Sequence, residues 1–269
     1  MVEYSLNKSA KATLAQAAGT YLEQPVAGPL GAYFGSMWLH SLPTAEVAPI
    51  VVVPDGCIDL QLIDGVLRVA GPDREAQTES FSPGTTILGL RFLPTRAPAW
   101  LGLPASEILN QRVPLEDLLG AKARRLSDDL GGAREPAELA QRLEKLIALR
   151  RPPPTRGRVD MYAAFELVSS GAPPGRPLIP WLLGKLAVSE RTLRRRFDES
   201  FGYGPKTLDR ILRFQRFLHL TRTRRGASGA SLAAEAGYTD QAHLVRESRR
   251  LAGATPCEIA AAESRFPPT

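Results

Sequence analysis

The sequence predicts an α+β protein of two domains. A small antiparallel β barrel or sandwich with flanking helices precedes an all-α domain, in which a long helix joins two helix-turn-helix motifs. Five short strand-like runs separated by turn signals lie within residues 33–93. A Pro- and Arg-rich break, RRPPPTRGR, covers residues 150–158, and consecutive prolines favour an extended linker. Beyond this break apolar residues recur at helical spacing. We therefore place the domains at residues 1–150 and 159–269, with a linker at 151–158.

The strand-like runs are YFGSMWLH from Tyr33, IVVV from Ile50, IDLQLID from Ile58, VLRVAG from Val66 and TILGLRFL from Thr86. Asp64–Gly65, between two alternating runs, is the strongest hairpin signal in the chain. Helix-like segments follow at residues 95–101, 104–109, 115–130 and 136–149. Residues 1–30 contain no motif that predicts an element.

The first helix-turn-helix pattern covers residues 179–202. A short apolar helix ends at residues 187–188, and Ser189 is a good N-cap for the next helix because its hydroxyl can accept a hydrogen bond from an orphan backbone N–H. An inward stripe at i, i+4 and i+8 then consists of Leu193, Phe197 and Phe201. The same periodicity leaves Arg191, Arg194 and Arg195 on outward faces.

The second pattern repeats this arrangement after a long basic helix at residues 206–222. SLAAEAGY begins at Ser231, and Asp240 is the N-cap of the following helix. Leu244 and Leu251 share the inward face of that helix. Its arginines, Arg246, Arg249 and Arg250, face elsewhere. Two copies of helix, tight turn and basic helix within roughly 75 residues indicate a DNA-binding domain.

Positive charge is concentrated in this part of the chain. Residues 179–251 contain 15 of the 34 Lys and Arg residues but only 7 of the 28 Asp and Glu residues. A basic domain on a slightly acidic body indicates a polyanionic partner. The alternative is an ordinary solvated helix surface with an Arg-rich composition, and the paired motifs favour the polyanion.

The C-terminal segment resembles the DNA-binding domain of the AraC/XylS transcription regulators. The matching residues of the first motif are Ser189, Arg191, Leu193, Arg195, Phe197, Gly202 and Pro205. Those of the second are Ala233, Ala236, Gly237, Tyr238, Asp240, His243, Arg246, Gly253, Thr255 and Pro256. The sequence departs from the family at Ser248, where a core aromatic is usual, and at Gly184, where Ala is usual. The resemblance implies a regulator that binds specific double-stranded DNA at a promoter or operator.

By position in the family motif, the expected DNA-binding residues are Arg191, Thr192, Arg194, Arg195, Gln241, Ala242, Val245 and Arg246. Arg can donate two hydrogen bonds to guanine, whereas Ala or Val can at most contact a thymine methyl group. We therefore expect the first motif to dominate specificity. Two structural alternatives remain: Arg195 can pair with Glu199 at i+4, and His243 can serve capping rather than DNA contact.

The N-terminal part resembles a cupin-like sensor domain that precedes AraC-type domains in some bacterial regulators. The matching residues are Pro54, Asp55, Gly56, Cys57, Asp59, Leu60, Gly89, Arg91, Phe92 and Pro94, and Thr95 stands where the family usually has Gly. The resemblance implies a small-molecule effector in an apolar cavity with a few polar groups. Candidates for the effector-binding wall are Trp38, Asp55, Cys57, Asp59, Arg91, Phe92 and Trp100.

Each of these candidates also has a structural explanation. The aromatic side chains can be core residues, and Asp55–Gly56 can be a simple turn. Cys57 can be a small buried apolar side chain or a redox sensor. Neither Cys57 nor Cys257 has a second cysteine near it in the sequence, so no disulfide framework is expected.

Residue counts and motifs argue against an enzyme. Only His40 of the three histidines lies outside the helical domain, so a His-rich metal centre is excluded, and no cofactor is expected. No nucleotide-binding or serine-hydrolase motif occurs in a fitting context. The remaining alternatives to a regulator are a scaffold that binds nucleic acid without specificity and an enzyme tethered to DNA by its helical domain.

Further expectations concern partners and location. No apolar run approaches the ~20 residues that cross a bilayer, and the first residues do not resemble a secretory signal, so we expect a cytoplasmic protein without a membrane partner. A leucine stripe, Leu139, Leu143, Leu146 and Leu149, together with the family resemblance, predicts a homodimer. RNA polymerase is an expected partner if the regulator is an activator.

Overall fold

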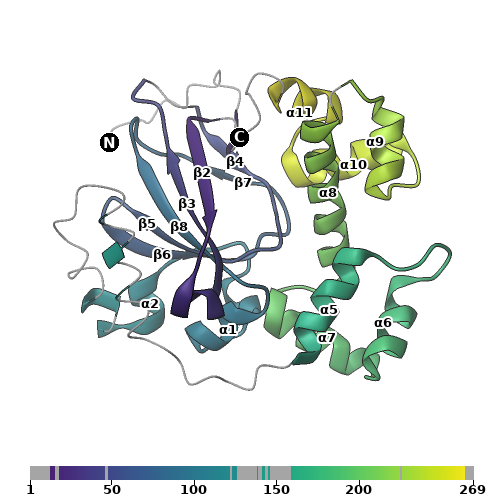
Figure 1. The fold of residues 1–269 in the computed structure, drawn as a ribbon, viewed down its shortest axis with the longest axis horizontal. Helices are drawn as coiled ribbons and strands as arrows, with labels where there is room; N and C mark the ends of the chain where they lie inside the picture. The colour runs from purple at the N-terminus through teal and green to yellow at the C-terminus, as the bar shows by residue number, and fades with distance from the viewer. Residues whose placement is uncertain are drawn as a thin grey trace, which may run out of the picture.

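A computed structural model of the chain describes residues 13–15, 18–45, 48–121, 123–125, 159–224 and 226–263, together with residues 138, 141, 142 and 145. A β-rich N-terminal part lies beside a helical C-terminal part (Figure 1). The proposed linker at 151–158 and the leucine stripe lie outside the described residues. Most of the helix-like segment at 136–149 lies outside them as well.

The N-terminal part contains two sheets. The larger sheet has the order β2 (Thr20–Pro25), β3 (Phe34–Ser41), β8 (Thr86–Phe92), β5 (Asp59–Ile63), β6 (Val66–Ala70) and β9 (Arg112–Pro114), and all its pairs are antiparallel. The smaller sheet has the order β1 (Thr13–Leu14), β4 (Ile50–Val52) and β7 (Gln77–Glu79). All five predicted strands are therefore confirmed. The sequence did not predict β1, β2, β7 and β9, which are very short or, in β2, largely exposed.

The predicted hairpin is confirmed in its register. Ile63 pairs with Val66 across the turn, and Asp64 and Gly65 have φ values of 49° and 80°. A two-residue turn with positive φ at both positions matches the right-handed twist of the strands that it joins.

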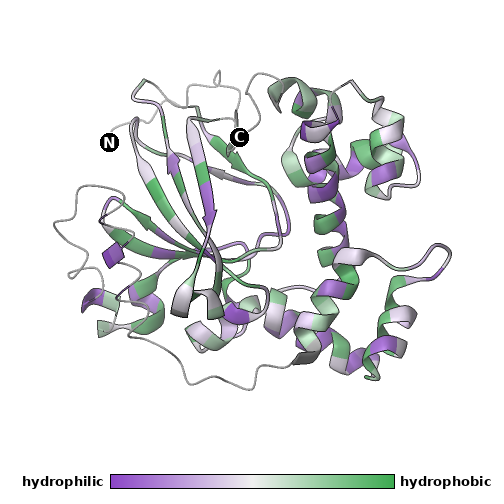
Figure 2. Ribbon diagram, in the orientation of Figure 1, coloured by the Kyte–Doolittle hydropathy of each residue, from purple (hydrophilic) through white to green (hydrophobic). Residues whose placement is uncertain are grey.

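Side chains alternate across the larger sheet, as successive Cβ atoms of a strand point to opposite faces. One face is apolar: Leu60, Leu62, Val69, Leu88 and Leu90 pack against α1 (Arg96–Leu101), η3 (Ala105–Ile108) and α2 (Leu115–Leu119). The opposite face carries Asp59, Gln61 and Arg91 toward a cavity. Hydrophilic and hydrophobic bands alternate along the strands in Figure 2. The helix expected over 115–130 is interrupted, because α2 ends at Leu119 and Gly120 adopts a φ of 58°. Residues 121 and 123–125 are helical again, and residues 126–130 lie outside the described part of the chain.

The C-terminal part is all helical, as predicted. Its helices are α5 (Val159–Ser170), α6 (Leu178–Leu186), α7 (Glu190–Phe201), α8 (Pro205–Thr223), α9 (Gly229–Ala236), α10 (Gln241–Ala252) and α11 (Pro256–Glu263). Their shared core is built around α8, whose Leu208, Ile211, Phe214 and Phe217 are at most 1% exposed. Among the described residues, no helix combines the length and apolar character needed to cross a bilayer.

The two parts are in contact at α7 and α8. The C-terminal end of α7 packs against η3 and α1. Gly202, which ends α7 at a φ of 81°, leaves so little room that an added Cβ would lie 2.8 Å from Pro72 and 3.1 Å from the Ala105 carbonyl oxygen. The turn at residues 54–57 lies against α8, with the position of a Gly56 Cβ 3.4 Å from Leu208.

Candidate functional site

The first helix-turn-helix motif is formed by α6 and α7. Ala187 ends α6 in the left-handed region at a φ of 51°, and the Ser189 hydroxyl accepts a hydrogen bond from the Thr192 backbone N–H at 3.2 Å. The buried stripe of Leu193, Phe197 and Phe201 holds α7 against the domain core. This orientation leaves the predicted DNA-binding arginines of α7 exposed: Arg191, Arg194 and Arg195.

Two side chains of α7 have local partners. The Arg195 Nη1 lies 2.8 Å from the Glu199 Oε1, one helical turn away, so the predicted i,i+4 pair is present. Since both side chains are well exposed, this ion pair contributes little stability and can exchange for another anion. Thr192 is half-buried, and its Oγ1 lies 2.9 Å from the Ser189 Oγ as part of the N-cap.

The second motif, formed by α9 and α10, has the same local construction. Gly237 ends α9 at a φ of 90°, and the Asp240 carboxylate accepts a hydrogen bond from the His243 backbone N–H at 2.6 Å. The His243 ring meets the Tyr238 ring edge-on at a centroid distance of 5.2 Å. The remaining predicted DNA-binding residues are the exposed Gln241, Ala242 and Arg246 and the half-buried Val245.

Three arginines of α8 fix the second motif rather than face outward. Arg216 donates to the carbonyl oxygens of Ala236 at 3.2 Å and Ser169 at 2.8 Å, which are the ends of α9 and α5. Carbonyls at a helix end lack intrahelical partners, and a cation there stabilises them. Arg213 pairs with Asp209 and lies 5.7 Å from the Tyr238 ring centroid. Arg210 lies 3.4 Å from the Glu247 carboxylate.

The two departures from the family pattern, Ser248 and Gly184, occupy a buried and an exposed position respectively. Ser248 is fully buried in α10, and its hydroxyl has no hydrogen-bond partner among the described residues. Gly184 lies on the exposed side of α6, and an added Cβ would meet nothing within 4 Å.

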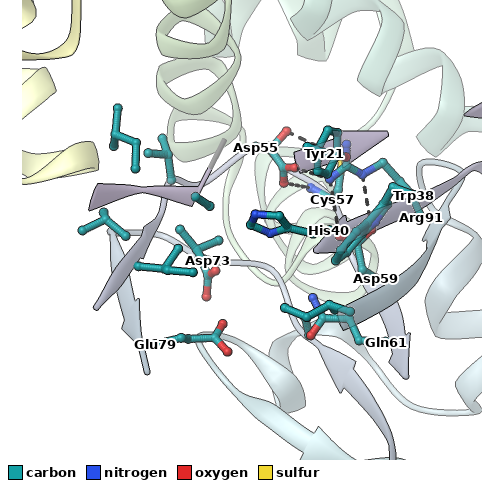
Figure 3. Close-up of a pocket in the computed structure, with 18 of the residues that line it drawn as sticks. Tyr21, Trp38, His40, Asp55, Cys57, Asp59, Gln61, Asp73, Glu79 and Arg91 are labelled. Carbon is teal, nitrogen blue, oxygen red and sulfur yellow. Dashed lines mark hydrogen bonds and ion pairs between the residues drawn. The ribbon is translucent and has the colours of Figure 1, made fainter. Parts of the chain in front are cut away.

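A cavity of about 360 Å³ lies between the two sheets (Figure 3). Its polar wall comes from the larger sheet and includes Tyr21, Trp38, His40, Asp59, Gln61 and Arg91. Its apolar wall includes Leu14, Ile50, Val51 and Val52 of the smaller sheet, together with Phe81. Gln215, Leu218 and Arg222 of α8 complete the lining. The cavity is thus bounded by both parts of the chain, and its size falls within the range of small-molecule sites.

One end of the cavity is organised around Arg91. Its Nη2 lies 2.8 Å from the Asp55 Oδ2, its Nε 3.2 Å from the Asp59 Oδ1, and its Nη1 3.5 Å from the Glu23 Oε1. Burial raises the pKa of Asp59 to about 6; Arg91 opposes that shift and Asp55 adds to it. The Tyr21 hydroxyl donates to the Glu23 Oε2 at 2.7 Å.

The other end of the cavity, the balanced end, holds as many arginines as carboxylates. Arg112 bonds the Asp73 Oδ2 at 2.7 Å and the Glu79 Oε1 at 2.8 Å. Arg68 also pairs with Glu79 and donates to the Gln61 Oε1 at 2.8 Å. Burial raises the pKa of Asp73 despite its bonds to Arg112. Burial acts in the same direction on Glu79, but Arg68 and Arg112 outweigh it and lower the pKa of that carboxyl.

The structure brings five predicted effector-site residues together around this cavity: Trp38, Asp55, Cys57, Asp59 and Arg91. The expectation for Phe92 and Trp100 is corrected. Phe92 follows Arg91 on β8 and therefore points to the opposite face, where it packs with Trp100 of α1 at a centroid distance of 5.5 Å. Burial raises the pKa of the Cys57 thiol well above its usual value, which disfavours the thiolate that redox sensing requires.

Sequence reasoning missed several lining residues: Tyr21, His40, Gln61, Arg68, Asp73, Glu79, Arg112, Gln215, Leu218 and Arg222. Two of them carry a signal in the sequence. Gln61 lies two residues from Asp59 on the same strand, and the two-residue hairpin turn places Arg68 opposite Gln61. His40 carries a similar signal, since it lies two residues from Trp38 on a predicted strand. Most of the others lie on unpredicted strands or depend on how α8 packs against the sheets.

Two protein families match separate parts of the chain. A family described as "Helix-turn-helix domain" matches residues 182–262, and a "Domain of unknown function (DUF6597)" matches residues 24–114. No curated protein matches the chain.

Similar solved structures include ToxT from Vibrio cholerae at 1.65 Å, with 12% identity, 90% of this chain and 98% of that chain covered, and a TM-score of 0.46. ToxT from Vibrio cholerae O395 is 12% identical, with 91% of this chain and 99% of that chain covered and a TM-score of 0.47. Wild-type ToxT from Vibrio cholerae strain SCE256 with a bound unsaturated fatty acid is 11% identical, with 93% of this chain and 96% of that chain covered and a TM-score of 0.42. The comparisons thus identify a helix-turn-helix domain over residues 182–262, the segment in which the structure forms both helix-turn-helix motifs.

Proposed function

We propose that the chain is a transcription regulator that binds specific double-stranded DNA through α7 and α10. The observation that carries this proposal is the pair of capped helices at the two ends of α8, each with an exposed N-terminal half. In helix-turn-helix proteins the N-terminal residues of the second helix contact base edges in the major groove. Here those positions carry Arg191, Arg194 and Arg195 on α7 and Gln241 and Arg246 on α10.

The first motif supplies most of the base discrimination in this proposal. Three exposed arginines on α7 can each donate two hydrogen bonds to guanine O6 and N7. The corresponding part of α10 offers Gln241 as its one amide donor, beside the methyl of Ala242 and the half-buried Val245. The second motif then acts chiefly as an anchor on phosphates, with Arg246 as the main contact.

A small molecule in the cavity controls DNA engagement in this proposal. The cavity has the volume and mixed lining of a ligand site, and α8 contributes to its wall. Because α8 also carries both motifs, a ligand that favours one packing of α8 against the sheets changes the arrangement of the reading helices. Such control requires only that the ligand bind the two arrangements with different affinity.

We further propose a cytoplasmic homodimer that contacts RNA polymerase if it activates transcription. The support for the dimer is the leucine stripe and the family resemblance. Light scattering on the purified full chain tests it directly: a mass of twice 29.2 kDa is expected, and a monomer at micromolar concentration would contradict the dimer.

The regulator is tested by fluorescence anisotropy with the DNA upstream of its own gene against scrambled DNA, across a salt series. A preference of about a thousandfold or more with a steep salt slope is expected. Equal affinity for every upstream and scrambled sequence, with the same salt slope, would instead identify a non-specific nucleic-acid scaffold.

A further inference from the structure

The two ends of the cavity differ in charge. At the balanced end, Arg68 and Arg112 face Asp73 and Glu79. At the Arg91 end, a single guanidinium is shared by three carboxylates, those of Glu23, Asp55 and Asp59. With Asp55 and Asp59 ionised, the cavity lining at the Arg91 end carries one negative charge in excess, and the third carboxylate, that of Glu23, lies outside the lining. A further cation of the lining, Arg222, lies seven residues along α8 from Gln215, roughly 10 Å of helix axis.

At this end, hydrogen-bond acceptors are also more available to a ligand than the donors of Arg91. Arg91 uses Nε for Asp59, Nη1 for Glu23 and Nη2 for Asp55. These bonds engage all three guanidinium nitrogens, so an anionic ligand would compete with the carboxylates already bound there. An ionised carboxylate, in contrast, has about four lone-pair sites and can accept from further donors. The Arg91 end therefore offers several carboxylate acceptors to a ligand, and its donors are the largely engaged guanidinium and the Trp38 Nε1–H, which has no hydrogen-bond partner among the described residues.

Aromatic and apolar surfaces flank these acceptors. The rings of Tyr21 and Trp38 lie 5.8 Å apart at an interplanar angle of 30°, and both line the cavity beside Asp59 (Figure 3). Aromatic faces attract organic cations, most strongly where water is excluded. The opposite wall, from β4 and Phe81, is apolar and can accommodate the carbon skeleton of such a cation.

We propose that the cavity binds a small organic cation, a protonated alkyl- or arylamine, with its ammonium group at Asp55 and Asp59 and its apolar body against β4. This ligand class rests on the proposed function of the cavity as the effector site. The raised pKa of Asp59 agrees with it, because Arg91 alone does not compensate the burial of that carboxylate. An ammonium group would supply the missing positive charge and hold Asp59 ionised.

Three probes of nearly equal shape and different charge test the proposal: 3-phenylpropylamine, 3-phenyl-1-propanol and 3-phenylpropionate. Calorimetric titration of the full chain at pH 7.5 is expected to show the amine binding at least tenfold more tightly than the alcohol or the carboxylate. Asp59→Asn is expected to weaken amine binding about tenfold and to leave alcohol binding unchanged. Asp64→Asn, which changes an exposed carboxyl at the hairpin turn, serves as the matched control and should change neither.

Tighter or equal binding of the alcohol or the carboxylate would overturn the cationic class, and so would an amine Kd weaker than about 1 mM. Circular dichroism of each variant verifies that it is folded. Anisotropy with DNA on the same preparations separates the two proposals. Specific DNA binding without amine binding refutes only the ligand class, whereas amine binding without any DNA binding refutes only the regulator.

Discussion

The side-chain amide of Gln215 donates a hydrogen bond to the Pro54 carbonyl oxygen, with Nε2 and O 2.8 Å apart. Gln215 belongs to α8, the helix that joins the two helix-turn-helix motifs, and Pro54 precedes Asp55, which binds Arg91 inside the cavity. One turn of chain therefore contacts the cavity on one side and α8 on the other. A change in the interactions of Asp55 can therefore alter the contact with α8 through the turn at residues 54–57.

Replacing Gln215 with Ala is expected to loosen this contact without unfolding either part. The lost hydrogen bond contributes roughly 0.5–1.5 kcal/mol, so the turn at residues 54–57 should exchange its amide hydrogens severalfold faster. Hydrogen exchange followed by mass spectrometry measures this. His219→Ala, at an exposed position of the same helix, is the control. Unchanged exchange at residues 54–57 in the Gln215 variant would show that the bond does not hold the turn.

Arg194→Ala is expected to lower affinity for the operator by about 1–3 kcal/mol and to relax the base preference at one position. Arg246→Ala should instead weaken binding to all sequences alike and reduce the salt slope by about one unit. Anisotropy with a set of single-base operator variants distinguishes these outcomes. A larger change of base preference in the Arg246 variant than in the Arg194 variant would reverse the assigned roles of α7 and α10.

Gly89→Ala is expected to displace the Trp38 indole, because an added Cβ would lie 2.0–2.5 Å from three of its ring atoms. Overpacking of this kind typically costs about 1–3 kcal/mol of unfolding free energy, and the emission of Trp38 should change. Gly184→Ala is the matched control with the opposite expected sign, since an exposed helical Ala stabilises by roughly 0.5–1 kcal/mol relative to Gly. Urea unfolding measures both variants, and a neutral Gly89 variant would contradict the close contact.

Ser248→Ala is expected to raise the free energy of unfolding by about 1 kcal/mol. The Ser248 hydroxyl is buried without a hydrogen-bond partner among the described residues, and an unsatisfied buried polar group costs about 1–3 kcal/mol. Ser231→Ala, at an exposed position of α9, should stay within about 0.5 kcal/mol of the parent. A destabilised Ser248 variant would mean that the hydroxyl is satisfied, for instance by a water molecule.

Stability should depend on pH through Asp59. Its folded pKa of about 6 lies above the ordinary value of 3.8, so the folded state binds more protons than the unfolded state between these values. The contribution of Asp59 to stability is therefore favourable at low pH and is lost as pH rises from about 4 to about 6, by up to roughly 2–3 kcal/mol. Asp59→Asn should flatten this part of the profile in urea unfolding from pH 4 to pH 7.5. An identical slope in parent and variant would assign the effect to other groups.

Local signals explain why the helical part could be predicted so fully. Caps at Ser189 and Asp240 and stripes such as Leu193, Phe197 and Phe201 act within a few residues, and the structure confirms each of them. The cavity depends on long-range pairing instead. Glu79 reaches Arg112 across 33 residues of sequence, and Gln215 reaches Pro54 across 161. No spacing rule predicts such contacts. Phe92 directly follows Arg91 on β8, and the alternation of side chains along a strand places it on the face opposite the cavity.

The division of the larger sheet into two faces has a consequence for how the cavity can change between related sequences. Leu60, Leu88 and Leu90 belong to the hydrophobic core. Their neighbours on the same strands, Asp59, Gln61 and Ile87, border the cavity. Substitutions at the latter positions change the chemistry of the chamber without opening voids in the core. Exchanges at a few alternate strand positions can therefore change what the cavity accommodates, while the scaffold and its contact with α8 stay intact.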